Sequence, residues 1–174
     1  PLEVRVGEHP LPHLRTQKGR HLLAMLALRL PREVQREWLI ANLWPESDPQ
    51  KGSYNLSRTL TDLRTALGPA RVCLFTPSPH SLSLCASTEV DVDVVRFDSL
   101  VRKGDSVSLA SAVELYRGPL LEGFVEEWAV VAREARQQAC LRALDTLAKK
   151  SAEQEDWTAA TRVLKRRIAL DAFD

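Results

Sequence analysis

A stripe of four leucines gives the chain its most regular hydrophobic pattern. They follow the i, i+4, i+7, i+11 spacing that places apolar side chains on one face of a helix. These leucines are Leu56, Leu60, Leu63 and Leu67. Asp48 suits the N-cap position and Pro49 the first helical position, while Gly68 and Pro69 supply a stop. The pattern therefore predicts a helix over Pro49–Leu67.

The face opposite the leucine stripe is polar and carries cations. At about 100° per residue, four side chains point directly away from the stripe and three lie on its flanks. The outer residues are Lys51, Tyr54, Arg58 and Thr65, and the flanking ones are Asn55, Thr61 and Asp62. Such a face suits insertion into a DNA major groove. Periodicity alone favours the simpler alternative, a solvated surface helix.

Two further helices and a short hairpin are predicted before this helix. Alternation at Leu2, Val4 and Val6 indicates a strand that turns back near Pro10. Thr16 can cap a helix over Gln17–Leu30, which brings Lys18 and Arg20 into its first turns, where backbone amides can meet a phosphate. The alternative for both cations is simple exposure. A second helix is predicted over Arg36–Leu43.

The pattern after Gly68 changes to short apolar runs. Val72–Phe75 and Leu82–Cys85 read as two strands joined by a turn over Thr76–Ser81. Three helices followed by a hairpin is the order of a winged helix-turn-helix. The turn holds no Lys or Arg, so Arg71 and His80 are the only candidate phosphate contacts of this wing.

The composition shifts near residue 90, where we place a domain boundary between 1–89 and 90–174. Val90 and Val92 suggest one last strand. Four helices are then predicted, at Val94–Lys103, Leu109–Tyr116, Glu126–Ala152 and Trp157–Leu170. The last two resemble a tetratricopeptide-like pair, and because one pair cannot cover its own apolar face, we expect more repeats beyond Asp174.

The last helix is predicted to bury one apolar stripe and to expose a basic run. The stripe consists of Ala160, Val163, Leu164 and Ile168. Lys165, Arg166 and Arg167 form the run, which is either a wetted face or a docking patch. The four tryptophans are expected to be packing anchors. They are Trp38, Trp44, Trp128 and Trp157.

The two halves of the chain differ weakly in net charge. Residues 1–90 carry 11 Lys and Arg against 8 Asp and Glu, whereas residues 91–174 carry 13 against 15. The predicted recognition helix lies in the basic half, which permits nucleic-acid binding without demanding it. Strong binding would need dimers or repeated sites.

Other functional classes have little support in the sequence. Cys73, Cys85 and Cys140 lack the spacing of a zinc site and are expected to be small buried hydrophobes. The four histidines form no metal-binding pair, and no phosphate loop or nucleophile elbow is present. We therefore predict no enzyme activity, metal or cofactor. Without a signal peptide or an apolar run of about 18 residues, a cytoplasmic protein is expected.

Four segments of the chain resemble the Streptomyces antibiotic regulatory protein family of transcriptional activators. They are LRTQKGRHLLAMLAL (14–28), LIANLWPESDPQKGSYNLSRTLTDLRTALG (39–68), VDVDVVRFDSLV (90–101) and LYRGPLLEGF (115–124). The resemblance covers almost the whole chain, and the last segment is the most specific. It implies an OmpR-like winged helix followed by a bacterial transcriptional activator domain of stacked helices. The implied fold is mainly α with small β.

The resemblance also implies functional surfaces and partners. The recognition helix would be Pro49–Leu67 and the wing Val72–Leu84, both on double-stranded promoter DNA. The loop formed by Pro45, Glu46, Ser47 and Asp48 would contact RNA polymerase. Family members often act as dimers on direct repeats, so a homodimer is a further expectation. The chain departs from the family pattern at Gly52, in the first turns of the recognition helix. Glycine there lowers helix stability by roughly 1 kcal/mol relative to Ala.

Two alternatives to this activator remain open. In the first, a winged helix that no longer binds DNA serves with the helical repeat as a protein-interaction or regulatory module of a larger signalling protein. The near-neutral charge and the wing turn without Lys or Arg favour it. The second is a ligand-sensing helical domain, for which the sequence names no binding residue.

Overall fold

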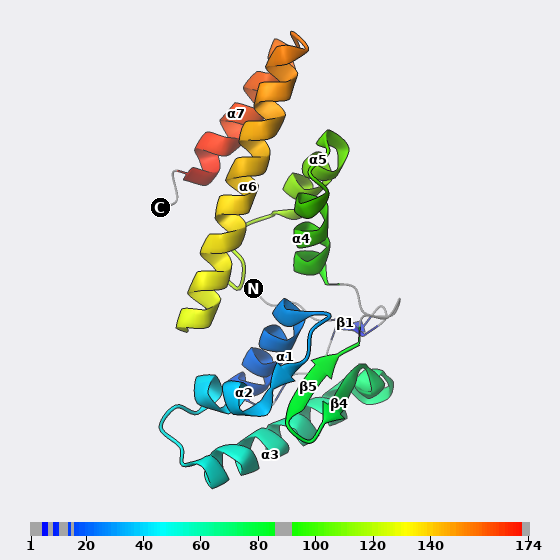
Figure 1. Ribbon diagram of the computed structural model, residues 1–174, viewed down its shortest axis with the longest axis vertical. Coiled ribbons are helices and arrows are strands. Elements are labelled where there is room, and N and C mark those ends of the chain that lie inside the picture. Colours follow the sequence, from blue (N-terminus) through cyan, green and yellow to red (C-terminus); the bar gives the residue numbers. More distant parts are fainter. Residues whose placement is uncertain (1–4, 7–8, 11–13, 15, 86–91, 172–174) are drawn as a thin grey trace. The chain divides into compact units, whose positions relative to one another are not determined.

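The computed structural model describes residues 5–6, 9–10, 14, 16–85 and 92–171. The chain divides into two compact units, Leu2–Val92 and Asp93–Asp174. Both are built mainly from helices, and the first also holds a three-stranded sheet (Figure 1). The mainly α fold with small β is therefore confirmed.

Three helices form the frame of the first unit, and their ends match the sequence closely. They are α1 (Gln17–Arg29), α2 (Arg36–Leu43) and α3 (Pro49–Leu67). The Thr16 side chain caps α1 by accepting a hydrogen bond from the Gly19 backbone N–H at 3.2 Å. After α3, Gly68 adopts a φ of 54°, a backbone conformation that favours glycine.

A small antiparallel sheet completes the winged helix. Its strands are β3 (Val34–Gln35), β4 (Leu74–Ser78) and β5 (Ser81–Leu84), in the order β3-β5-β4. Val34 pairs with Leu82, and Leu74 pairs with Leu84. All four of these side chains are buried, so the sheet closes over the leucine core of the helices. Strand β3 was not predicted.

The wing is shorter than its predicted bounds. A 3-10 helix, η1 (Gly68–Cys73), occupies the place where the first strand was expected to begin, and Val72 within it is 70% exposed. Strand β4 instead extends to Ser78, which leaves only Pro79 and His80 between the strands. Pairing with four-residue β5 sets these limits, because a strand extends only as far as its hydrogen-bonding partner reaches.

The N-terminal hairpin is present as two short antiparallel strands. Strands β1 (Arg5–Val6) and β2 (His9–Pro10) pair through Arg5 with Pro10 and Val6 with His9. The last strand proposed near residue 90 is not supported, since Val92 lies outside any strand and Val90 lies outside the described residues.

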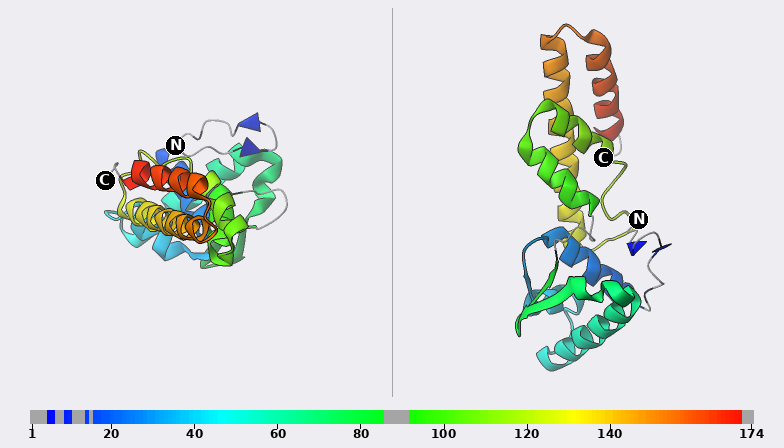
Figure 2. Two further views of the ribbon diagram at one scale, coloured as in Figure 1. Left: turned by 90° about the horizontal axis from the view of Figure 1, so that it is seen from above. Right: turned by 90° about the vertical axis from the view of Figure 1, so that its right-hand side faces the viewer.

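Four helices make up the second unit, as predicted. They are α4 (Asp93–Lys103), α5 (Ser106–Leu115), α6 (Glu127–Glu153) and α7 (Trp157–Asp171). The long helix α6 packs side by side with α7, and α5 packs on both α4 and α6 (Figure 2). Phe97 and Tyr116, whose ring centroids are 6.0 Å apart, lie in a shared core with Cys140 and Leu144.

The apolar stripe predicted to be buried on α7 is only partly buried. Ala160 is buried and Val163 is half-buried, but Leu164 is 44% and Ile168 is 64% exposed. Trp157 is 66% exposed, so its predicted packing role is wrong. The other three tryptophans are half-buried. Packing against α6 uses the narrow face of α7 centred on Ala160, and the wider stripe stays exposed.

The basic run of α7 is not a plain solvated face. Arg166 bonds Glu114 at 2.6 Å and donates to the Val113 carbonyl at 2.6 Å. Arg167 pairs with both Asp145 and Asp171. These two arginines therefore hold helices together within the second unit. Lys165 alone of the three is exposed.

Candidate nucleic-acid interface

Helix α3 is fixed at its start by an N-cap and along its length by the leucine stripe. The Asp48 carboxylate accepts a hydrogen bond from the Lys51 backbone N–H at 2.9 Å. Pro49 occupies the first turn, where its missing N–H leaves no donor unsatisfied. All four stripe leucines are buried at 7% exposure or less. The rotation of α3 about its axis is therefore set, and so is the face that it exposes.

Five of the predicted DNA-contact residues share that exposed face. They are Lys51, Tyr54, Arg58, Thr61 and Thr65, all classed as exposed. Tyr54 is 66% exposed, an unusual position for an aromatic ring on a helix without a partner. Asn55 is half-buried at the edge, so less of its amide is available to a base. These five residues include two cations, and half-buried Asp62 adds a carboxylate at the flank of the same face, one turn after Arg58.

The two threonines of this face are already hydrogen-bonded within the helix. The Thr61 hydroxyl donates to the Ser57 carbonyl at 3.0 Å, and the Thr65 hydroxyl donates to the Thr61 carbonyl at 2.9 Å. In this arrangement each hydroxyl oxygen can accept a hydrogen bond from a ligand but has no proton left to donate. The pair therefore suits base amino groups or a thymine methyl better than phosphate oxygens.

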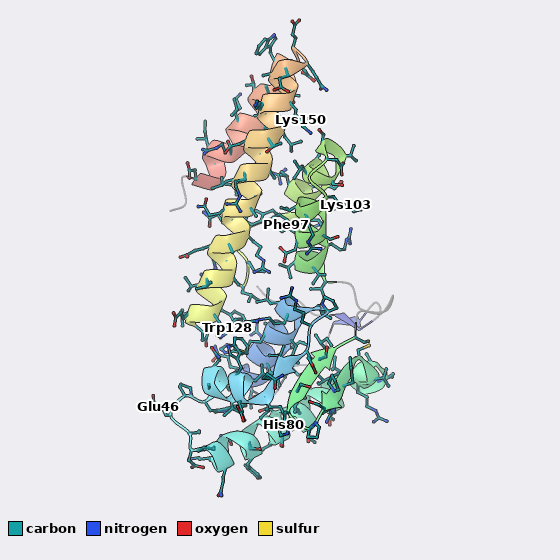
Figure 3. All side chains as sticks on the ribbon, in the orientation of Figure 1. Glu46, His80, Phe97, Lys103, Trp128 and Lys150 are labelled. Carbon is teal, nitrogen blue, oxygen red and sulfur yellow. The ribbon has the colours of Figure 1, made fainter. Side chains whose placement is uncertain are left out.

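The wing is linked to α3 by Arg64, which was not among the predicted contact residues. The Arg64 guanidinium donates to the Thr76 hydroxyl on β4 at 3.3 Å. Arg71 is exposed on η1, and His80 is exposed at the turn between the strands (Figure 3). Helix α3 and both candidate wing residues thus belong to one folded unit. Arg64 could have been found only by knowing that β4 passes beside the end of α3.

A carboxylate lies against the wing turn. The Ser81 hydroxyl donates to the Glu33 carboxylate at 2.5 Å and lies 2.7 Å from the Ser78 hydroxyl. The Arg36 backbone N–H also donates to the His80 carbonyl at 2.8 Å. Glu33 therefore adds negative charge where a wing would approach the DNA backbone. The position of Glu33 beside the wing could not be predicted from the sequence, because Glu33 precedes the unpredicted strand β3.

The remaining predicted contact residues, on α1 and in the loop before α3, differ in exposure and in hydrogen bonding. Lys18 and Arg20 are half-buried in the first turns of α1, and one amide of that turn, Gly19 N–H, is occupied by the Thr16 cap. In the predicted polymerase loop, Ser47 is half-buried and donates its backbone N–H to the Trp44 carbonyl at 3.0 Å. The other three residues of the loop are exposed, and Figure 3 shows Glu46 on the segment between α2 and α3.

Within the described part of the chain, no group of three or more His, Cys, Asp or Glu side chains could hold a metal ion. Over residues 5–6, 9–10, 14, 16–85 and 92–171, no helix is both long and apolar enough to cross a bilayer.

Comparison with known proteins gives a structural match. No protein-family model matches the chain, and no curated protein matches it in sequence. Among solved structures, it is similar to Mycobacterium tuberculosis EmbR in complex with a low-affinity phosphopeptide, with a TM-score of 0.64 and 26% sequence identity. The match covers 99% of this chain and 53% of the EmbR chain, so this chain spans about half of EmbR. The likeness supports a fold of the transcriptional-regulator type.

Proposed function

We propose that this chain is a sequence-specific DNA-binding transcriptional activator. Residues 1–89 would bind double-stranded promoter DNA through α3 and the wing, and residues 90–174 would act as the activator domain. One observation carries the proposal: α3 is capped and locked by its leucines so that Lys51, Tyr54 and Arg58 share one exposed face. The match to EmbR supports a regulator of this architecture.

The residues of the α3 face can make two kinds of DNA contact: phosphate contacts that position the helix and base contacts that read the sequence. Lys51 lies in the first turn and can neutralise a phosphate, which fixes the position of the helix on the duplex. Arg58 lies two turns further along, and its planar guanidinium can bond a guanine O6 and N7 together. Tyr54 lies between them, where its ring can pack on the sugar-phosphate backbone.

A selection of bound sequences from random double-stranded DNA tests this function. We expect enrichment of a short motif and an affinity that falls steeply with salt, because each neutralised phosphate releases counterions. A matched control is the variant Lys51→Ala/Arg58→Ala, which leaves the leucine stripe and the Asp48 cap in place. If the wild-type chain enriches no sequence, the DNA-binding function is wrong.

RNA polymerase recruitment is the second part of the proposal. The loop residues Pro45, Glu46 and Asp48 are exposed beside the start of α3. Glu46→Ala should reduce activated transcription in vitro while DNA affinity stays unchanged. Asp48 is a poor choice for this test, because its substitution would also remove the cap of α3. A homodimer on direct repeats would show as cooperative occupancy of a two-site DNA, with little of the singly occupied species.

A protein-interaction module is the alternative function, and two observations favour it. Glu33 lies at the wing turn, where a DNA-binding wing would need neutral or positive groups. Trp157, Leu164 and Ile168 leave an exposed apolar stripe on α7, as is common at protein contacts. EmbR was also solved with a peptide bound. A chain that fails the DNA selection but keeps its fold would fit this alternative.

A further inference from the structure

Two cysteines lie opposite each other at the base of the wing. Cys73 ends η1 and Cys85 directly follows β5. The neighbouring residues Leu74 and Leu84 are paired in the antiparallel ladder. The Cys85 backbone N–H donates to the Cys73 carbonyl at 2.7 Å, which extends that ladder by one more pair. The backbone therefore places the two cysteines opposite each other at the ends of β4 and β5, just outside both strands.

This register meets the distance requirement of a disulfide. Residues that face each other across a hydrogen-bonded antiparallel pair have Cα atoms about 5.5 Å apart. Disulfides usually join Cα atoms separated by about 4.4 to 6.8 Å. Facing residues of such a pair also direct their side chains to the same side of the sheet. Their Cβ atoms are about 4.5 to 5.5 Å apart in such a pair, whereas a disulfide needs about 3.5 to 4.5 Å. Closure therefore requires side-chain rotation together with a small approach of the two backbone segments.

The two thiols differ in access to solvent. Cys73 is 3% exposed, whereas Cys85 is half-buried. An oxidant in solution would therefore react with Cys85 first, and the buried Cys73 would then react with the oxidised Cys85. Cys140 is the natural comparison within the same chain, because it is fully buried in the core of the other unit. Burial also raises the pKa of the Cys140 thiol to about 11, so little thiolate is available there.

We propose that Cys73 and Cys85 form a reversible disulfide site that locks the base of the wing, with a glutathione-type disulfide as oxidant. The Cys85 thiolate attacks one sulfur of the oxidant, forming a mixed disulfide and releasing one glutathione thiolate. The Cys73 thiolate then attacks the Cys85 sulfur, and the second glutathione leaves. The protein loses two protons and two electrons, and the oxidant is reduced to two glutathiones. This proposal does not depend on DNA binding.

Trypsin digestion makes the test direct. Val72–Arg96 contains both cysteines and no internal Lys or Arg, whereas Cys140 falls in the separate peptide Gln137–Arg142. The folded chain is incubated with glutathione disulfide, at a ratio to glutathione that oxidises a reference dithiol. Remaining thiols are then blocked with N-ethylmaleimide before digestion and mass spectrometry.

The expected result is a Val72–Arg96 peptide that carries neither blocking group nor glutathione and is lighter by two hydrogen atoms. Cys140 should remain a thiol. In Cys73→Ser the mixed disulfide should persist on Cys85, and in Cys85→Ser the buried Cys73 should stay unmodified. Dithiothreitol should reverse the wild-type change.

Three outcomes would overturn the proposal. One is a stable glutathione adduct on wild-type Cys85 without ring closure. Another is retention of both thiols under the oxidising ratio. The last is a cross-link between two chains on a non-reducing gel in place of the internal bond. The variant Cys140→Ser serves as the matched control, because it removes the third thiol and should leave the wild-type result unchanged.

Discussion

Gly52 packs directly under Ile40, and this contact sets the spacing between α2 and the candidate recognition helix. A Cβ built on Gly52 would overlap the Ile40 Cγ2 atom. Gly52 is itself buried, although it lies only in the second turn of α3. Helix propensity alone suggested that Gly52 only weakens α3. Its contact with Ile40 gives it a packing role as well. It lets two helices approach closely.

Gly52→Ala tests this contact because helix propensity and overpacking change the free energy of unfolding in opposite directions. Helix propensity alone would stabilise the alanine variant by about 1 kcal/mol. Overpacking costs about 1 to 3 kcal/mol, and the branched Ile40 side chain has little rotamer freedom to move aside. We expect the overlap to dominate and the free energy of unfolding to fall by up to about 2 kcal/mol. Urea unfolding followed by circular dichroism measures it.

The matched control for this substitution is Gly118→Ala. A Cβ on Gly118 meets nothing within 4 Å, so that variant should unfold like the wild type or slightly later. In a double-mutant cycle, Gly52→Ala should cost less in an Ile40→Ala background than in the wild type, since the overlapping atom is absent there. A higher urea midpoint for Gly52→Ala than for the wild type would show that the contact is not limiting.

The helices could be predicted from the sequence because their signals are local. Asp48, Pro49 and Gly68 specify both ends of α3 within a few residues, and the leucine stripe specifies its buried face. The start of α1 is likewise specified by the Thr16 cap. Capping and periodicity depend on neighbours in the chain, so they can be read without knowing the fold.

Features created by distant contacts could not be predicted in this way. Strand β3 has two residues and exists only because β5 pairs with it. The role of Gly52 depends on Ile40 in another helix, and the place of Glu33 depends on Ser81 in the wing. The exposure of Ile168 depends on which face of α7 meets α6. None of these pairs is close in sequence.

Arg133 holds the segment 115–124, the most specific part of the sequence resemblance. Its guanidinium donates to the carbonyls of Leu120, Leu121 and Phe124, each at 2.8 Å. The segment also contains backbone at positive φ, 50° at Leu121 and 87° at Gly123. A planar group with several donors can satisfy three carbonyls at once, so this arginine replaces the regular hydrogen bonds that the loop lacks.

Arg133→Lys should therefore destabilise the second unit even though the charge is kept. An ammonium group cannot reproduce the fork of donors, and we expect a loss of about 1 to 2 kcal/mol in the free energy of unfolding. Arg142→Lys is the matched control, because Arg142 is exposed on the same helix α6. Equal melting temperatures for the two variants would argue against the loop-holding role. Differential scanning calorimetry provides the comparison.

Glu33→Gln tests the electrostatic effect of the wing turn on DNA. Glutamine keeps an oxygen that can accept the Ser81 hydrogen bond, so the wing should stay folded. Two unit charges at contact distance in water interact by about 1 kcal/mol, which limits the expected gain in affinity to about fivefold. The gain should be similar for cognate and scrambled DNA and should shrink with added salt. Fluorescence anisotropy of labelled duplexes measures both.

The control for Glu33→Gln is Glu134→Gln, a removal of the same charge from the exposed surface of α6. If the wing approaches the DNA backbone, Glu33→Gln should raise the affinity more than the control does. Identical affinities for the two variants would place the wing away from the DNA, and recognition would then rest on α3 alone.

Lys51→Ala and Arg58→Ala should have different effects on DNA binding, although each removes one cation from the same exposed face. Lys51→Ala should weaken binding about equally for all sequences and reduce the salt slope by about 1. Arg58→Ala should instead lose discrimination at one base pair, by about 1 to 3 kcal/mol. Competition titrations over a set of single-base variants of the selected site separate the two outcomes. Arg162→Ala, which removes an exposed cation from α7, is the control for net charge. If Arg58→Ala weakens all sequences equally, Arg58 contacts the backbone and the base-reading residue must be sought among Asn55, Thr61 and Thr65.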